Sequence, residues 1–131
     1  MSNMALNQYR SVSVQSGMTD ATPHHMITML LDGALDRVAS AKGAIDRGEV
    51  SRKGELLGSA IAIIDSMRAS LDFDKGGEIA TNLGSLYDYI EGRLVEANAS
   101  SNLTLLDEVS ALLRESKAGW PAIPADVRKT P

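Results

Sequence analysis

Cysteine is absent from this sequence of 131 residues, and proline occurs only four times. Without cysteine the chain has no disulfide, no thiolate zinc site and no cysteine nucleophile, which suits the reducing cytosol. The prolines lie at positions 23, 121, 124 and 131, so residues 24–120 lack the residue that most strongly breaks helices. This distribution favours an all-α domain.

Long hydrophobic runs are also missing. The longest, such as Met29–Leu31 and Ile61–Ile64, are far shorter than the roughly 20 residues that span a bilayer. Met1–Thr19 contains no continuous apolar stretch of the kind found in secretion signals. We therefore expect a soluble intracellular protein without membrane insertion.

Positive charge is not in excess. The net charge is −4, and the 13 lysine and arginine residues are scattered along the chain. Such a chain has no field that would attract the phosphates of DNA or RNA. We therefore expect no nucleic-acid partner.

What the sequence does contain is helical periodicity. Apolar residues recur at the spacing of one helix face in four stretches. Thr22, Ser51 and Asn102 are suitable N-terminal caps for the first, second and fourth of them. The expected helices are Pro23–Arg47, Ser51–Leu71, Gly76–Asn98 and Leu103–Ala118.

Four helices of similar length joined by short loops predict an antiparallel up-and-down four-helix bundle. The bundle domain is expected over residues 22–120. Residues 1–21 are rich in Ser, Asn and Gln, and residues 121–131 contain three prolines. These compositions predict a mobile N-terminal arm and a mobile C-terminal tail, unless either segment docks on the bundle.

The second helix carries an unusually wide apolar stripe. Its members span about 160° of the helical wheel, whereas one packed seam needs only about 100°. Three explanations stay open: a groove for a partner helix, a central position in a small bundle, or a homodimer contact. The stripe consists of Leu56, Leu57, Ala60, Ile61, Ile63, Ile64, Met67 and Leu71.

Catalytic and metal-binding patterns are weak. His24 and His25 are adjacent, so on a helix they point about 100° apart and do not chelate one ion; a solvent-facing first turn is the simpler expectation. Residues 72–77 resemble the start of a calcium loop, but Leu83 stands where a bidentate glutamate is required. A polar turn between helices is expected there. We find no triad, P-loop or dinucleotide fingerprint, and expect neither an enzyme nor a cofactor.

A set of short motifs occurs along the chain: Asp20–Pro23, Met29–Ala34, Ser70–Asp72, Gly76–Ala80, Asn82–Leu83, Leu86–Tyr89, Ala97–Asn98 and Trp120. In their order and spacing over roughly Tyr9–Trp120, these motifs resemble one known family, that of the flagellar secretion chaperone FliS. One departure is Leu31, which stands where the family commonly has tyrosine.

The resemblance implies a cytoplasmic, non-enzymatic four-helix bundle. Such a protein would bind the disordered C-terminal segment of flagellin, prevent its premature polymerisation and deliver it to the flagellar type III export apparatus. Tyr9 would match the N-terminal tyrosine that covers the empty groove or docks at the export gate. The alternative is a self-associating bundle, and a monomer or weak dimer is expected when the protein is free.

The contact surface with the partner is expected on the second and third helices. One edge would be the apolar side chains of Leu56, Ile63 and Met67, which would receive the partner's apolar anchors. The adjoining edge would contain Asn82, Leu86 and Tyr89, where the Asn82 amide can satisfy polar groups of the partner backbone. For Leu86 the competing interpretation is core packing, and for Asn82 it is an ordinary solvated or interhelical hydrogen bond.

Overall fold

The computed structural model of the protein describes residues 23–129, apart from the side chains of Pro23 and Ala125. The predicted N-terminal arm, including Tyr9, lies outside these residues. Within them the chain forms four long helices and two short 3-10 turns. The helices are α2 (Pro23–Asp46), α3 (Val50–Ala69), α4 (Phe73–Ser100) and α5 (Leu103–Gly119), followed by η1 (Trp120–Ala122) and η2 (Ala125–Val127).

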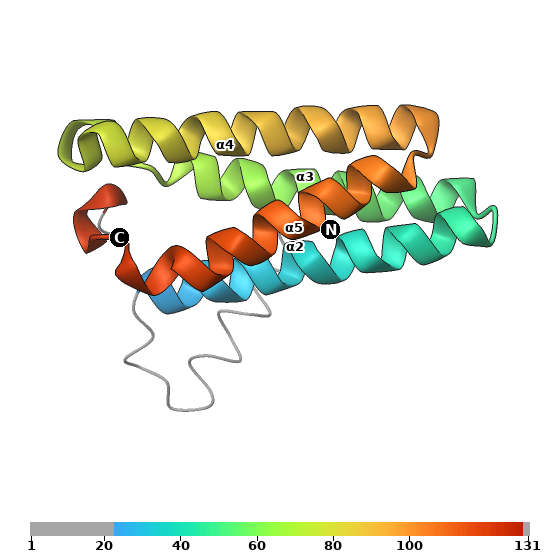
Figure 1. Ribbon diagram of the computed structural model, residues 1–131, viewed down its shortest axis with the longest axis horizontal. Coiled ribbons are helices and arrows are strands. Elements are labelled where there is room, and N and C mark those ends of the chain that lie inside the picture. The colour runs from blue at the N-terminus through green and yellow to red at the C-terminus, as the bar shows by residue number, and fades with distance from the viewer. Residues whose placement is uncertain (1–22, 130–131) are drawn as a thin grey trace.

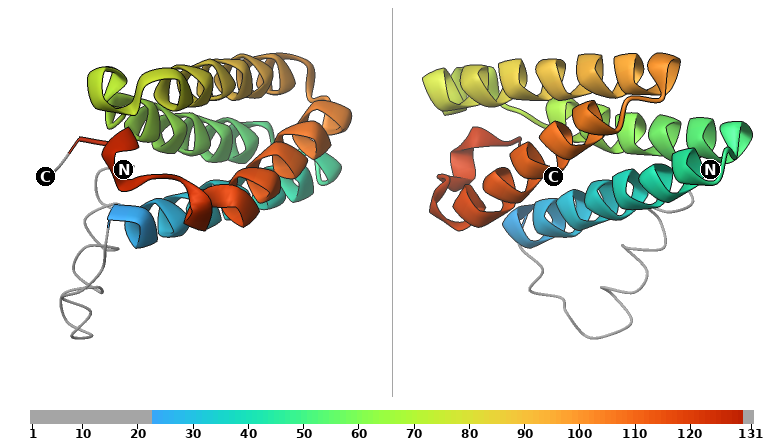
Figure 2. Two further views of the ribbon diagram at one scale, coloured as in Figure 1. Left: turned by 60° about the vertical axis from the view of Figure 1, so that its left-hand side comes forward. Right: turned by 45° about the vertical axis from the view of Figure 1, so that its right-hand side comes forward.

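The four helices form the predicted antiparallel bundle, in which each helix reverses the direction of the one before it (Figure 1). Helix α2 packs against α3 and α5, and α4 packs against the same two helices. Helix α5 runs obliquely, from the C-terminal end of α4 toward the N-terminal end of α2 (Figure 2). No helix in the described part of the chain is long and apolar enough to cross a membrane.

The helix ends follow from local side-chain chemistry. The Asn102 side chain caps α5 by accepting hydrogen bonds from the backbone N–H groups of Thr104 and Leu105, as predicted. Asp72 caps α4 in the same way through the N–H of Lys75, which confirms a polar turn at this position. The prediction of Ser51 as a cap was wrong, because α3 begins at Val50 after Glu49 and makes no side-chain cap.

Helix α4 contains a sharp break at Gly77. This residue has φ 53° and ψ −130°, a conformation that glycine adopts far more easily than any other residue. The break sets the turn Phe73–Gly76 at an angle, so that the ring of Phe73 lies against Gly84. The predicted start at Gly76-Gly77 therefore corresponds to a kink inside α4.

The core combines small and large apolar side chains. On α2 it buries Ala34, Ala41 and Ala44 completely, which permits a close approach of the neighbouring helix. The largest side chain buried within the four helices is Tyr87 of α4. The charged side chain of Lys53 in α3 is also buried, and its ammonium group donates to Asn98 O and Ser101 Oγ at 2.8 Å each. Lys53 therefore ties the start of α3 to the C-terminal end of α4.

Residues 121–131 were predicted to form a mobile tail unless they docked on the bundle, and the described part of this segment, residues 121–129, packs against the bundle together with Trp120. Trp120 and Val127 are 3% and 1% exposed, and Arg128 is 5% exposed. The segment lies at the end of the bundle where α4 begins and α5 ends (Figure 1). Its composition predicts mobility only in the absence of a docking site, and the fold provides one.

Candidate functional site

The predicted contact residues on α3 lie in the core. Leu56 is 8% exposed, Ile63 1% and Met67 0%. The other members of the wide stripe are likewise buried or half-buried, because α3 packs against both α2 and α4. This conformation leaves no surplus apolar face at these positions, and the central packing of α3 accounts for the width of the stripe.

The predicted contact residues on α4 lie at the surface. Asn82, Leu86 and Tyr89 follow one another at intervals of four and three residues, so they share one side of the helix. We call them the α4 edge. Asn82 and Tyr89 are exposed, whereas Leu86 is half-buried and packs on the core. The structure therefore brings these three residues together but separates them from Leu56, Ile63 and Met67.

Tyr89 links α4 to α5 at one end of this edge. Its hydroxyl donates to Glu108 Oε2 at 2.8 Å and accepts from Arg93 Nε at 3.0 Å. Arg93 also forms an ion pair with Glu108 at 3.1 Å, and its guanidinium lies 5.1 Å from the centre of the Tyr89 ring. The tyrosine ring remains 43% exposed, so it presents apolar surface in a held orientation.

Additional apolar side chains are exposed on α4. They include Ile79 at 39%, Phe73 at 51% and Val95 at 57%. Ile79 lies one turn before Asn82 and extends the α4 edge toward the start of the helix. Val95 lies nine residues after Leu86 and so points to the opposite side of the helix. Hydrophobic periodicity did not identify Val95, because it lies outside the core stripe.

Acidic side chains gather between α3 and α4. Glu91 is half-buried, and burial raises its pKa; the nearby carboxylates of Asp65 and Asp88 raise it further, whereas Arg68 lowers it. Arg68 pairs with Asp88 at 2.7 Å. Despite this concentration of carboxylates, residues 23–129 contain no cluster suited to a metal ion.

His24 is not turned to solvent as predicted. Its ring is half-buried, stacks on Trp120 with centroids 4.7 Å apart, and its Nε2 donates to Ile123 O at 2.5 Å. In return, Trp120 Nε1 donates to His24 O at 2.9 Å. The histidine therefore serves to dock the C-terminal residues against α2.

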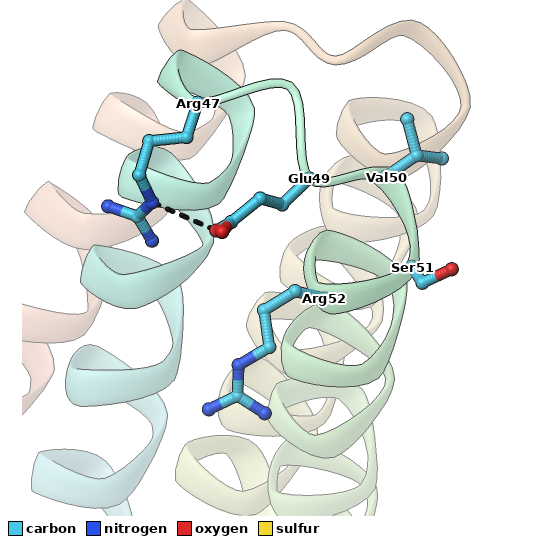
Figure 3. A pocket seen from close by; sticks show the side chains of 5 residues that line it. All are labelled: Arg47, Glu49, Val50, Ser51 and Arg52. Atoms are coloured by element: carbon cyan, nitrogen blue, oxygen red, sulfur yellow. Dashed lines mark hydrogen bonds and ion pairs between the residues drawn. The ribbon is translucent and has the colours of Figure 1, made fainter.

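A shallow pocket at the α2–α3 turn is lined by Arg47, Glu49, Val50, Ser51 and Arg52 (Figure 3). Arg47 pairs with Glu49 at 2.9 Å, and Arg52 pairs with Glu55 at 3.3 Å. These neighbouring carboxylates neutralise both guanidinium groups. The pocket therefore has neither an arrangement of nucleophile and base nor a free cationic cluster.

A buried polar cage surrounds Arg128 at the end of the bundle. The guanidinium donates to Met67 O at 2.6 Å, to Tyr87 Oη at 2.5 Å and to Ser70 Oγ. It also lies 4.8 Å from the centre of the Trp120 ring. Burial lowers the pKa of Arg128 and raises that of Tyr87. Sequence reasoning missed this cage, whose only signal was an apolar residue followed by a cation within a proline-rich tail.

Comparison with known proteins gives a consistent result. Residues 5–127 match the family model described as flagellar protein FliS. The flagellar secretion chaperone FliSB of Pseudomonas aeruginosa is 50% identical over 119 residues, which cover 91% of this chain and 94% of the relative. The flagellar secretion chaperones FliS of Salmonella typhimurium and Vibrio cholerae are 44% and 39% identical; the matches cover 90% and 93% of this chain, and 88% and 90% of the relatives.

Proposed function

This chain belongs to the FliS family, and from that membership we propose that it is a cytoplasmic chaperone for flagellin. It binds the disordered C-terminal segment of flagellin, prevents premature polymerisation and delivers the subunit to the flagellar type III export apparatus. The observation that carries the proposal is the family match over residues 5–127. Its relatives are named as chaperones, and this proposal includes no catalytic step.

The physical basis is that the chaperone supplies contacts that the flagellin segment would otherwise make in the filament. A disordered segment that forms helices only in the assembled filament needs apolar surface to fold against, and a chaperone can supply that surface beforehand. The ordering of the segment costs conformational entropy, which keeps the complex releasable at the export gate.

We assign the first contacts to the α4 edge, because its side chains are accessible. Leu86 and the exposed ring of Tyr89 offer apolar surface, and the Asn82 amide can both donate and accept hydrogen bonds. Leu56, Ile63 and Met67 would join the contact surface only if the bundle opened around α3. Tyr9 remains the proposed residue for covering the groove or docking at the export gate.

Calorimetry with a synthetic flagellin C-terminal peptide tests the function. We expect one-to-one binding. If the peptide produces no heat and forms no complex with the protein, the proposal is overturned. If the protein is instead a self-associating bundle, light scattering would show a stable homodimer that the peptide does not disturb.

The position of the surface is tested with two variants of α4. Leu86→Asp places a charge within the α4 edge and is expected to weaken binding at least about tenfold, as loss of a central anchor does. Val95→Asp puts the same charge on the opposite side of the helix and should leave the affinity unchanged. Equal effects of the two substitutions would place the contact surface elsewhere.

A further inference from the structure

The docked C-terminal residues occupy a surface with the properties of a peptide-binding site. We call Trp120–Lys129 the C-terminal strap. We propose that the strap is a displaceable occupant of a docking surface at the α3–α4 turn, and that an extended segment of the exported subunit takes its place. This inference rests on the proposed chaperone function and adds to it a second contact surface with its own regulation.

The surface first offers a main-chain edge. Leu71 and Arg128 form an isolated antiparallel bridge, flanked by hydrogen bonds from Asp72 N to Val127 O at 2.8 Å and from Lys129 N to Ser70 O at 3.0 Å. Pairing of this kind recognises an extended backbone independently of its side chains. Any extended segment that reaches the turn can therefore use the same edge.

Beside this edge lie two sites for side chains. Val127 is buried where α4 begins, and at Gly76 an added Cβ would lie 2.9 Å from the Val127 Cα, so the close approach requires glycine. The next residue, Arg128, enters the cage made by Met67 O, Ser70 Oγ and Tyr87 Oη. The surface therefore suits an extended segment with an apolar residue followed by a cation.

The cage compensates the burial of the Arg128 guanidinium only in part. Arg128 is 5% exposed, yet in the described part of the chain it forms no salt bridge, and its Nε is buried without a hydrogen-bond partner. A buried cation without a carboxylate keeps much of its desolvation cost, because carbonyl and hydroxyl oxygens compensate it only in part. This cost makes the docked state of the strap less stable and so eases its release.

The backbone of the strap also permits release. It is made of two short 3-10 turns separated by Ile123 and Pro124, and it follows Gly119, the residue type with the greatest backbone freedom. Ala122 and Pro124 are exposed, so much of the strap touches the bundle only through a few anchors. The strap can lift from the turn while α2–α5 keep their packing.

A reversible cross-link provides the main test. Ser70 and Lys129 are opposite each other beside the bridge, and directly opposed residues of an antiparallel pair lie within the Cα distance that a disulfide accepts. The chain lacks cysteine, so Ser70→Cys with Lys129→Cys introduces the only thiols. The oxidised protein has a locked strap, and the reduced form of the same protein is its control.

We expect the oxidised form to bind the flagellin C-terminal peptide at least about tenfold more weakly than the reduced form, because the competent state is no longer populated. Equal affinities of the two forms would overturn the displaceable strap while leaving the chaperone function intact. Absence of binding by the unaltered chain would instead overturn the proposed function, and this inference with it.

A second pair of variants loosens the strap without a cross-link. Lys129→Pro removes the N–H that donates to Ser70 O, whereas Lys129→Ala keeps it and loses the same exposed side chain charge. The proline variant should bind the peptide about threefold or more tightly than the alanine variant, since less of the protein is in the closed state. Equal or weaker binding by the proline variant would contradict the proposal.

Discussion

Individual side chains of α3 and α4 differ sharply in what they can contribute. Ile63 and Ile79 are both isoleucines on neighbouring helices, but the first is 1% exposed and the second 39%. A buried aliphatic side chain stabilises the fold through area removed from water and through close packing, which an exposed one does only in part. Ile63 therefore contributes mainly to the stability of the fold, whereas Ile79 is accessible to a partner.

Truncation of Ile63 should act on folding. We expect Ile63→Ala to lower the free energy of unfolding by about 2–5 kcal/mol, through lost burial and the cavity left behind. Ile79→Ala, the matched control, should cost less than about 1 kcal/mol. Urea denaturation followed by circular dichroism measures both values. A small loss at Ile63 would show that this side chain is not packed in the core.

The two tyrosine hydroxyls of α4 provide a second comparison. Tyr87→Phe removes an acceptor from the buried Arg128, so we expect it to cost about 1–3 kcal/mol. Tyr89→Phe removes a hydroxyl that bonds Glu108 and Arg93 at the surface, and should cost less than about 1 kcal/mol. Denaturant melts of the two variants compare these losses. Equal losses would argue against a buried cage around Arg128.

At the scale of the helix, two glycines of α4 differ in backbone conformation. Gly77 has a positive φ at the kink, whereas Gly92 lies in the regular helix, where an added Cβ would meet no atom within 4 Å. We expect Gly77→Ala to destabilise by about 1–3 kcal/mol, because alanine strains this conformation. Gly92→Ala should stabilise by about 0.5–1 kcal/mol, because alanine favours the helix. Thermal melts of both variants test this, and stabilisation by both would rule out the kink.

The contact between α3 and α4 should depend on pH through Glu91. Its folded pKa is raised, chiefly by burial, so the folded state holds the proton more tightly than the unfolded state. This contribution to stability is present below the unfolded pKa of Glu91 and is lost as pH rises through the raised folded pKa.

Glu91→Gln removes that titration and should raise the melting temperature at pH 7 but not at pH 4. An increase of about half a kcal/mol in the free energy of unfolding corresponds to a rise of roughly 2–4 °C in the melting temperature. The exposed Glu115 on α5 is the control, and Glu115→Gln should change neither temperature appreciably. Melting scans at the two pH values decide the matter. A lower melting temperature of Glu91→Gln at pH 7 would contradict the raised pKa.

For the whole molecule, the proposed binding of the flagellin segment should be visible as an increase in the stability of the folded protein. A ligand that binds only the folded state contributes about 2.7 kcal/mol when its concentration is a hundred times its dissociation constant. We therefore expect the melting temperature to rise with peptide concentration at constant protein concentration. A melting temperature that rises with protein concentration alone would indicate the self-associating bundle instead.

The sequence predicted the number, order and direction of the helices, because each helix repeats its apolar residues often enough to override local exceptions. Two of the four helix starts, those of α2 and α5, lie where caps and breakers predicted them; Ser51 does not cap α3, and α4 begins at Phe73 instead of Gly76. The candidate site was predicted less completely. Periodicity identifies which residues share a face, as with the α4 edge, but it does not say how many neighbours cover that face. For this reason Leu56, Ile63 and Met67 were assigned to a surface and are found in the core.

Composition alone could not anticipate the docking of the C-terminal strap. Its bonds join Arg128 to Met67, Ser70 and Tyr87, which are 41 to 61 positions away in the chain. Hydrogen bonds between such distant residues depend on where three helices and a turn meet. The same holds for Lys53, whose partners at the end of α4 are 45 and 48 positions away.

The sequence by itself therefore determined the all-α class, the antiparallel order of the helices and the family, since these depend on local periodicity and on ordered motifs. The tertiary structure decided which apolar residues remain accessible, where α4 bends, and that residues 120–129 cover the α3–α4 turn. The physical reason is that helix formation depends on contacts within a few residues, whereas burial depends on every element packed around a side chain.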